Sequence, residues 1–204
     1  PMDPNEYLLD ETWVPFEMEE DYLQIKLLGF LKIKNKQIFK YSKFGPVLEI
    51  QDKVFALRHS TQNSFQEIDG WFSLNEADSV QAFKSALSSR KIPSFNFVVM
   101  DSDKNIGFFY NGRIPARKNP QAARKVLQGI SSSDIWPLNQ PIESLPTFIN
   151  PSNGWIQSTN QNPYAVMGQY SMALDSKNPN VYFEQRLTNR SFVANELLST
   201  QAKI

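Results

Sequence analysis

Short runs of apolar or alternating residues, separated by turn formers, fill the chain from Tyr7 to Leu57. Alternation with a period of two is typical of strands, because successive side chains point to opposite faces of a sheet. Phe44-Gly45-Pro46 interrupts these runs as a tight turn. The pattern therefore predicts an antiparallel region. Its strands are expected at residues 13–16, 22–28, 30–34, 37–41, 47–50 and 54–57.

The spacing of apolar residues changes to a helical period between Asn75 and Arg90. The apolar side chains that fall on one face of such a helix are Ala77, Val80, Ala82, Phe83 and Leu87. Asn75 precedes them and is a suitable N-cap, since its side chain can accept a hydrogen bond from the first turn. The spacing predicts one helix over residues 75–90, and a second helix is expected over residues 182–200.

The segment between residues 118 and 154 is rich in Pro, Ser, Asn and Gln and has no clear period. We expect ordered irregular structure there, held by the large apolar side chains of Trp136, Leu145, Phe148 and Trp155. A short helix is expected near residues 121–127 and a strand over residues 155–159. No repeat or low-complexity tract marks a boundary, so residues 1–204 are expected to form a single segment.

The run from Phe95 to Arg117 predicts a hairpin. Residues 95–100 are rich in strand formers, residues 101–105 are turn formers whose side chains can bond their own backbone, and residues 106–110 resume the strand. The same run resembles the NF-x-x-x-D-x-x-G-N-I-G-Y…G-R-I-P-x-R tract of the penicillin acylase family. The members of this family are amide hydrolases whose nucleophile is the first residue of the mature large subunit.

Further segments resemble that family in the same order along the chain. They are Trp13–Glu17 (W-x-P-F-E), Lys43–Val47 (T-x-H-G-P-V, with Phe44 for His), Phe55–Arg58, Trp136 with Pro141–Pro146, and Asn150–Trp155 (N-P-P-S-G-W). The resemblance implies an α+β fold, part of a four-layer αββα N-terminal-nucleophile hydrolase in which antiparallel sheets are flanked by helices. It also places this chain in the core of the large (β) subunit.

Ser158–Pro163 is similar to the family's A-N-N-x-P motif. In the family, the first Asn of that motif donates its side-chain amide to the oxyanion hole, and the resemblance gives this role to Asn160. A neutral amide donor can stabilise a developing oxyanion by roughly 3 kcal/mol. Gln161 stands where the family has its second Asn. The alternative is that Asn160 only closes a turn before Pro163, since Asn is a common turn residue.

A family arginine that organises the site lies seven residues before a Leu-Leu pair, and Arg190 has that spacing to Leu197-Leu198. Arg186 lies one helical turn earlier and is an alternative. Arginine suits the role because its planar guanidinium binds carboxylates bidentately and stays charged. Either residue could instead be a solvated arginine on a helix face.

Composition narrows the remaining chemistry. Lys plus Arg and Asp plus Glu both total 21, so the net charge is zero and we expect neither nucleic acid nor a membrane as a partner. The chain has no cysteine and one histidine, His59, which is more plausible as a surface residue than as a base for the adjacent Ser60. Asp101 and Asp103 indicate a turn rather than a calcium loop, and the acidic run Glu19-Glu20-Asp21 a solvated turn.

No catalytic nucleophile is expected in this chain, because it begins with Pro1, whereas the family uses an amino-terminal Ser, Thr or Cys. We therefore expect a segment of a longer amide hydrolase that is inactive by itself and works with the remaining α and β chain segments. The resemblance implies small N-acylated amides as substrates, such as β-lactam antibiotics or acyl-homoserine lactones. It implies a periplasmic or secreted location and no cofactor in this segment, with a structural calcium possible elsewhere in the parent protein.

Two alternatives to this interpretation are open. The chain could be a non-catalytic binding or assembly module that keeps the acylase scaffold. It could also be an unrelated domain rich in β-strands, which a structure without stacked sheets and flanking helices would support.

Overall fold

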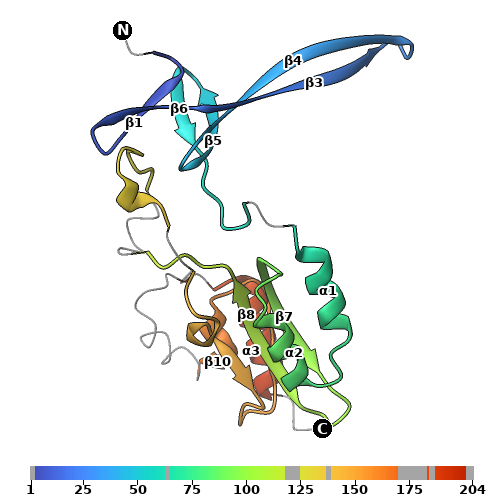
Figure 1. The fold of residues 1–204 in the computed structure, drawn as a ribbon. Coiled ribbons are helices and arrows are strands. Elements are labelled where there is room, and N and C mark those ends of the chain that lie inside the picture. The colour runs from blue at the N-terminus through green and yellow to red at the C-terminus, as the bar shows by residue number, and fades with distance from the viewer. Residues whose placement is uncertain are drawn as a thin grey trace. The chain divides into compact units, whose positions relative to one another are not determined.

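The computed structural model describes residues 3–62, 65–117, 125–136, 139–169, 183 and 187–200. Two compact units make up the chain: residues 1–62 with 125–136, and residues 63–124 with 137–204. We call them unit 1 and unit 2. Both units contain antiparallel sheets, and the α-helices of the described residues belong to unit 2 (Figure 1). The predicted α+β class is therefore confirmed, whereas a single segment without an internal boundary stays a prediction.

Unit 1 is built from antiparallel strands, as the alternating pattern predicts. A first hairpin pairs β1 (Glu6–Leu9) with β2 (Thr12–Pro15). A second sheet has the order β3-β4-β5-β6, with strands Glu17–Leu27, Leu31–Ser42, Gly45–Ile50 and Lys53–Ala56. The boundaries differ from those expected, because β4 is one strand from Leu31 to Ser42 that joins the two strands expected at residues 30–34 and 37–41. Asn35 and Lys36 pair with β3 instead of breaking the strand.

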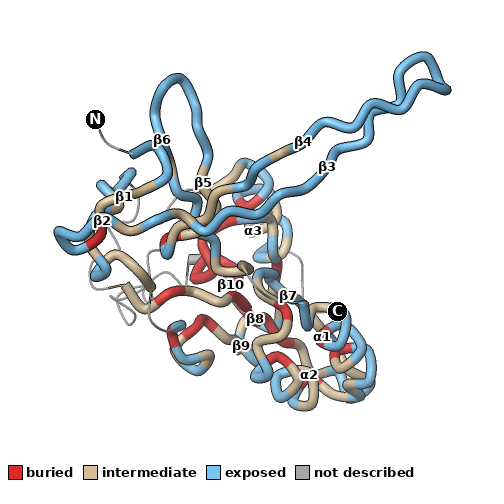
Figure 2. Tube along the Cα trace, turned by 45° about the horizontal axis from the view of Figure 1, so that its top comes forward, coloured by how far each residue is buried: buried red, intermediate tan, exposed pale blue. Residues whose placement is uncertain are grey.

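β3 and β4 form a long two-stranded ribbon that we call the arm. Its register pairs Glu17 with Tyr41 at one end and Leu27 with Leu31 at the other. Figure 2 shows exposed residues along nearly its whole length. The acidic run Glu19-Glu20-Asp21 lies within β3, so the expected turn is wrong, although its residues are solvated as expected.

Unit 2 contains the predicted hairpin, whose strands β7 (Ser94–Met100) and β8 (Ile106–Gly112) form a three-stranded sheet of order β7-β8-β9 with β9 (Thr147–Ile149). The hairpin register runs from Ser94 opposite Gly112 to Met100 opposite Ile106. At the far end of β8, Arg113 Nε donates to the carbonyl of Arg90 at 2.8 Å. The tract that most resembles the family thus has a structural role in the sheet.

Two helices precede this sheet where the sequence predicts one. α1 spans Glu67–Asn75 and α2 spans Val80–Leu87. The N-cap of α2 is Ser79, whose hydroxyl accepts a hydrogen bond from Ala82 N–H at 3.1 Å, whereas Asn75 is the last residue of α1. The single helix over residues 75–90 is therefore wrong, because Ser79 takes the capping position that the pattern gives to Asn75.

The later segments also differ from expectation. α3 spans Asn189–Thr200, and the described residues before it, Leu187 and Thr188, are not helical. Residues 155–159 do not form the expected strand, whereas Val166–Gln169 forms β10. Among the described residues, 3₁₀ turns span Ser132–Asp134, Ile142–Ser144 and Pro163–Ala165. The short helix expected near residues 121–127 falls mostly outside the described residues, and residues 125–127 are not helical.

The core of unit 2 lies on both faces of β8. Phe109 packs on one face with residues of α1 and α2, among them Leu74, Val80 and Leu87. Phe108 is completely buried on the other face, against Val166 and Met167 of β10. Leu145, Tyr164 and Phe183 extend that second layer, so the expected anchor Leu145 is buried. Tyr164 of this second layer follows closely in the chain after the loop that contains Asn160.

Candidate active site

The loop of residues 158–161 presents Asn160 on the surface of unit 2. Asn160 has a φ of +62°, a left-handed conformation that Asn adopts more readily than most residues. Two residues later, the Asn162 side chain accepts a hydrogen bond from Tyr164 N–H at 2.7 Å and begins the 3₁₀ turn at Pro163–Ala165. The loop therefore has a defined end, and Asn160 is exposed at its bend.

Arg190, the second residue of α3, lies next to Asn160. Its Nη2 donates a hydrogen bond to Asn160 Oδ1 at 2.8 Å, across 30 residues of sequence. A guanidinium has donors only, so the atom of the Asn160 amide that faces it must be the oxygen. The two N–H donors of Asn160, on Nδ2, take no part in that bond.

The start of α3 is also tied to this loop through Thr188. Its hydroxyl accepts a hydrogen bond from Ser191 N–H at 3.2 Å, which caps the helix, and donates to the Thr159 carbonyl at 3.3 Å. The resemblance did not identify Thr188. A threonine directly before a helix is a recognisable N-cap, and that signal could have placed the helix start at Asn189.

The structure therefore brings together two of the predicted site residues, Asn160 and Arg190. Arg186, the alternative to Arg190, lies outside the described residues. The catalytic roles of these residues stay predictions, since the geometry gives their positions and not their chemistry.

Other candidates from the sequence have structural partners. His59 Nδ1 lies 2.6 Å from Thr61 Oγ1, a partner other than the adjacent Ser60. Asp101 closes the β7–β8 turn: its carboxylate accepts hydrogen bonds from the backbone N–H groups of Val80, Asp103 and Asn105 and from the Asn105 side chain. These bonds, that of the Asn105 side chain first, hold the pKa of Asp101 below its ordinary value.

Asp101 therefore acts as a turn residue, as the sequence predicts. Within the described ranges, no group of three or more His, Cys, Asp or Glu side chains could hold a metal ion. A calcium ion in the parent protein stays a prediction.

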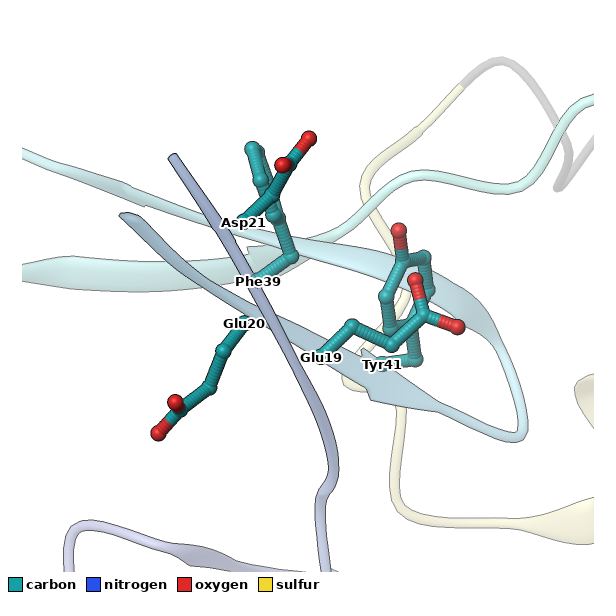
Figure 3. Close-up of a pocket in the computed structure, with 5 residues that line it drawn as sticks. All are labelled: Glu19, Glu20, Asp21, Phe39 and Tyr41. Atoms are coloured by element: carbon teal, nitrogen blue, oxygen red, sulfur yellow. The ribbon is translucent and has the colours of Figure 1, made fainter. Parts of the chain in front are cut away.

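A shallow hollow on the arm is lined by Glu19, Glu20, Asp21, Phe39 and Tyr41 (Figure 3). Glu19 extends toward Tyr41, and Glu20 points away from the other four side chains. Loss of hydration, followed by the charge of Glu19, raises the pKa of Tyr41. This hollow contains none of the predicted site residues.

The chain matches the penicillin amidase family over its residues 1–204. The chain belongs to the penicillin amidase family. This assignment confirms the resemblance drawn from the hairpin tract and excludes an unrelated β-rich domain.

Among curated relatives, the chain is similar to acyl-homoserine lactone acylase PvdQ of two Pseudomonas strains. It is 30% identical over 111 residues to the protein of Pseudomonas savastanoi pv. phaseolicola and 29% identical over 111 residues to that of Pseudomonas syringae pv. tomato. Each match covers 50% of this chain and 14% of the relative, so the chain spans a small part of these relatives' length.

Among solved structures, a thermostable penicillin G acylase from Alcaligenes faecalis has the same fold. The match has a TM-score of 0.76 at 17% identity and covers 98% of this chain and 34% of that one. The chain thus has the fold of a penicillin acylase, which agrees with the predicted fold class. None of the described helices is long and apolar enough to cross a membrane.

Proposed function

We propose that this chain forms part of an amide hydrolase of the penicillin amidase type, in which Asn160 donates to the oxyanion of the reacting amide. Membership of the family supports the hydrolase class. The hydrogen bond between Arg190 and Asn160 supports the proposed role of Asn160 as a donor. Because Arg190 binds the amide oxygen, the amide NH₂ group is the end that can donate to the oxyanion.

The proposed division of labour follows from the chemistry of the two side chains. Arg190 holds the oxygen of Asn160, so the Nδ2 group points its donors away from the guanidinium. When a nucleophile attacks the amide carbonyl, negative charge develops on the carbonyl oxygen, and a fixed neutral donor stabilises it without a proton transfer. Arg190 is exposed, so its other N–H groups are available to a substrate carboxylate.

The nucleophile in this proposal is the amino-terminal serine of the family's large subunit, supplied by another segment of the protein. This chain by itself is then expected to be inactive. The serine attacks the acyl carbonyl, the oxyanion forms next to Asn160, and the amine leaves. Water then hydrolyses the acyl-enzyme.

Small N-acylated amides are the proposed substrates. The curated relatives are named acyl-homoserine lactone acylases, and the solved structure is a penicillin G acylase, so acyl-homoserine lactones and β-lactam antibiotics are the two classes to test. A periplasmic or secreted location and a structural calcium in the parent protein belong to the same proposal. No nucleic acid or membrane partner is proposed.

The test is Asn160→Asp in the full protein that contains this chain, assayed with penicillin G and with a long-chain acyl-homoserine lactone. The aspartate can still accept the hydrogen bond from Arg190, but it has no N–H donor. We expect kcat to fall about 100- to 1,000-fold while KM changes little. An unchanged kcat would contradict the role of Asn160. So would a loss of activity that is accounted for by unfolding of the variant at the assay temperature.

The alternative, a binding module that keeps the acylase scaffold, predicts another outcome of the same assay. The unmodified full protein would then hydrolyse neither substrate. It would still bind them, and calorimetric titration would detect that binding.

A further inference from the structure

We infer that Gln161 is a positioning residue for Asn160, acting through a set of hydrogen bonds that joins the Gln161 side chain to the Gln157 carbonyl and the Gln157 side chain to Asn195. We call this set the amide relay. The inference deepens the proposed function, since it rests on Asn160 as the oxyanion donor.

Gln161 holds the loop on both sides of the bend. Its side chain is buried, with 6% of the residue exposed. Gln161 Oε1 accepts hydrogen bonds from Thr159 N–H at 2.5 Å and from Thr159 Oγ1 at 2.9 Å. Gln161 Nε2 donates to the Gln157 carbonyl at 3.2 Å. The residue after Asn160 is thus bonded to the residue before it, which fixes the left-handed bend at Asn160.

Gln157 connects this bend to α3. It is also buried, and its Nε2 donates to Asn195 Oδ1 at 3.0 Å and to the Ala165 carbonyl at 3.3 Å. Its backbone N–H donates to the Val166 carbonyl at 2.9 Å, beside β10. Asn195 lies on α3, five residues after Arg190.

The hydrogen bonds therefore close a ring. Arg190 on α3 binds Asn160, while Asn195 on the same helix is connected through Gln157 and Gln161 to Thr159. Asn160 and Arg190 are held by one frame, so the direction of the Asn160 amide depends on the relay. Displacement of a catalytic group by about 1 Å can lower a rate about 100-fold.

The length of the Gln161 side chain matters for this role. The family motif that the loop resembles has Asn at this position, and Asn is shorter by one methylene, about 1.5 Å. An Asn at position 161 is too short to keep both the bonds to Thr159 and the bond to the Gln157 carbonyl. We therefore expect that Gln161→Asn, which restores the family residue, impairs this protein.

The test uses Gln161→Asn and Gln161→Met in the full protein, with Asn111→Leu as the matched control. Asn111 is also a buried amide of unit 2, and its Nδ2 donates to the Ile92 carbonyl at 2.9 Å. We expect both Gln161 variants to lose kcat about 10- to 100-fold with KM within about 2-fold. The control is expected to lose thermal stability to a similar extent and to keep its kcat.

Gln161→Glu gives a readout that a general loss of stability cannot produce. An ionised glutamate still accepts from Thr159 but cannot donate to the Gln157 carbonyl, whereas its protonated form can donate again. We expect kcat of this variant relative to the unmodified protein to rise as the pH falls toward the ordinary glutamate pKa of about 4.3. A ratio that stays constant with pH would contradict the relay.

The inference can be separated from the proposed function. If Asn160→Asp abolishes activity and the Gln161 variants retain it, the relay is wrong and the oxyanion role stands. If the unmodified protein has no amidase activity, NMR of Asn-labelled protein decides the relay: the Asn160 side-chain signals should shift or broaden in Gln161→Asn and stay unchanged in Asn111→Leu. Unchanged Asn160 signals in Gln161→Asn would overturn the inference.

Discussion

The arm of unit 1 and the β7–β8 hairpin of unit 2 are both antiparallel ribbons, yet their environments are opposite. The arm pairs eleven residues of β3 with β4, and the hairpin pairs seven residues of β7 with β8. At the tip of the arm, Leu28 and Phe30 are 79% and 80% exposed. At the centre of β8, Phe108 and Phe109 are 0% and 3% exposed. Strand pairing alone therefore does not produce a core.

The difference comes from the layers that lie against each ribbon. β8 has α1 and α2 on one face and β10 with its neighbours on the other. The arm has a two-sided pattern instead. Toward the tip, one face carries Leu23, Ile25, Leu27, Leu31 and Ile33, and the opposite face carries Lys26, Lys32 and Lys34. Nearer the base both faces are mixed, with Asp21 on the first and Tyr22 and Ile38 on the second. The alternation toward the tip resembles that of a buried strand, but the five apolar residues there are 44% to 51% exposed.

The largest expected effect comes from removing the buried ring at the centre of unit 2. Phe108→Ala deletes a completely buried side chain and leaves a cavity, so the free energy of unfolding should fall by about 3 to 5 kcal/mol. Urea denaturation of the full protein that contains this chain measures this change. Phe30→Ala at the arm tip is the matched control and should change stability by about 0.5 kcal/mol or less. Equal losses in the two variants would contradict the comparison.

A smaller effect is expected at the turn of the hairpin. The hydrogen bonds to Asp101 depress its folded-state pKa, so the stability they confer is present above the unfolded pKa of about 3.9. It is lost as the pH falls through the lower folded-state pKa. We expect the urea midpoint of Asp101→Asn to fall less steeply over this acid range than that of the unmodified chain. Asp103→Asn removes the same charge in the same turn and should keep the steep fall; identical curves for the two variants would contradict the role of Asp101.

The smallest effect on stability is expected on the arm. Ile25 and Ile33 are opposite each other on its apolar face, and replacing both by Ser should cost about 1 kcal/mol or less. It should, however, reduce self-association, because exposed apolar faces favour contacts between copies. Sedimentation velocity at several concentrations measures this. The paired change Lys26→Ser and Lys32→Ser on the opposite face is the control, and a reduction of self-association only in the control would reverse the assignment of faces.

The sequence predicts the hairpin because local signals agree there: strand formers flank Asp101 and Asn105, which close the turn with their own side chains. The same reasoning fails at α1 and α2. Both Asn75 and Ser79 are good N-caps, and α1 buries only Gly70 and Leu74, too few residues to show a helical period. The interruption between the two helices is therefore invisible in the hydrophobic pattern.

In the candidate site, too, the sequence predicts one part and not the other. Asn160 and Arg190 follow from the family resemblance, but their proximity does not follow from spacing, because it depends on the packing of α3 near β10. The amide relay has no sequence period at all. Gln157 and Gln161 look like polar loop residues until the structure buries them against Thr159 and Asn195.

The left-handed backbone of Asn160 has a consequence for how this position tolerates change. Valine and isoleucine are strongly disfavoured at a φ of +62°, whereas glycine and aspartate accept it with little strain. Among substitutions at residue 160, then, those that preserve the shape of the loop are a small set, and none of them carries an amide donor. In a library of variants at this residue, glycine and aspartate should pass a screen for folding and fail a screen for amide cleavage.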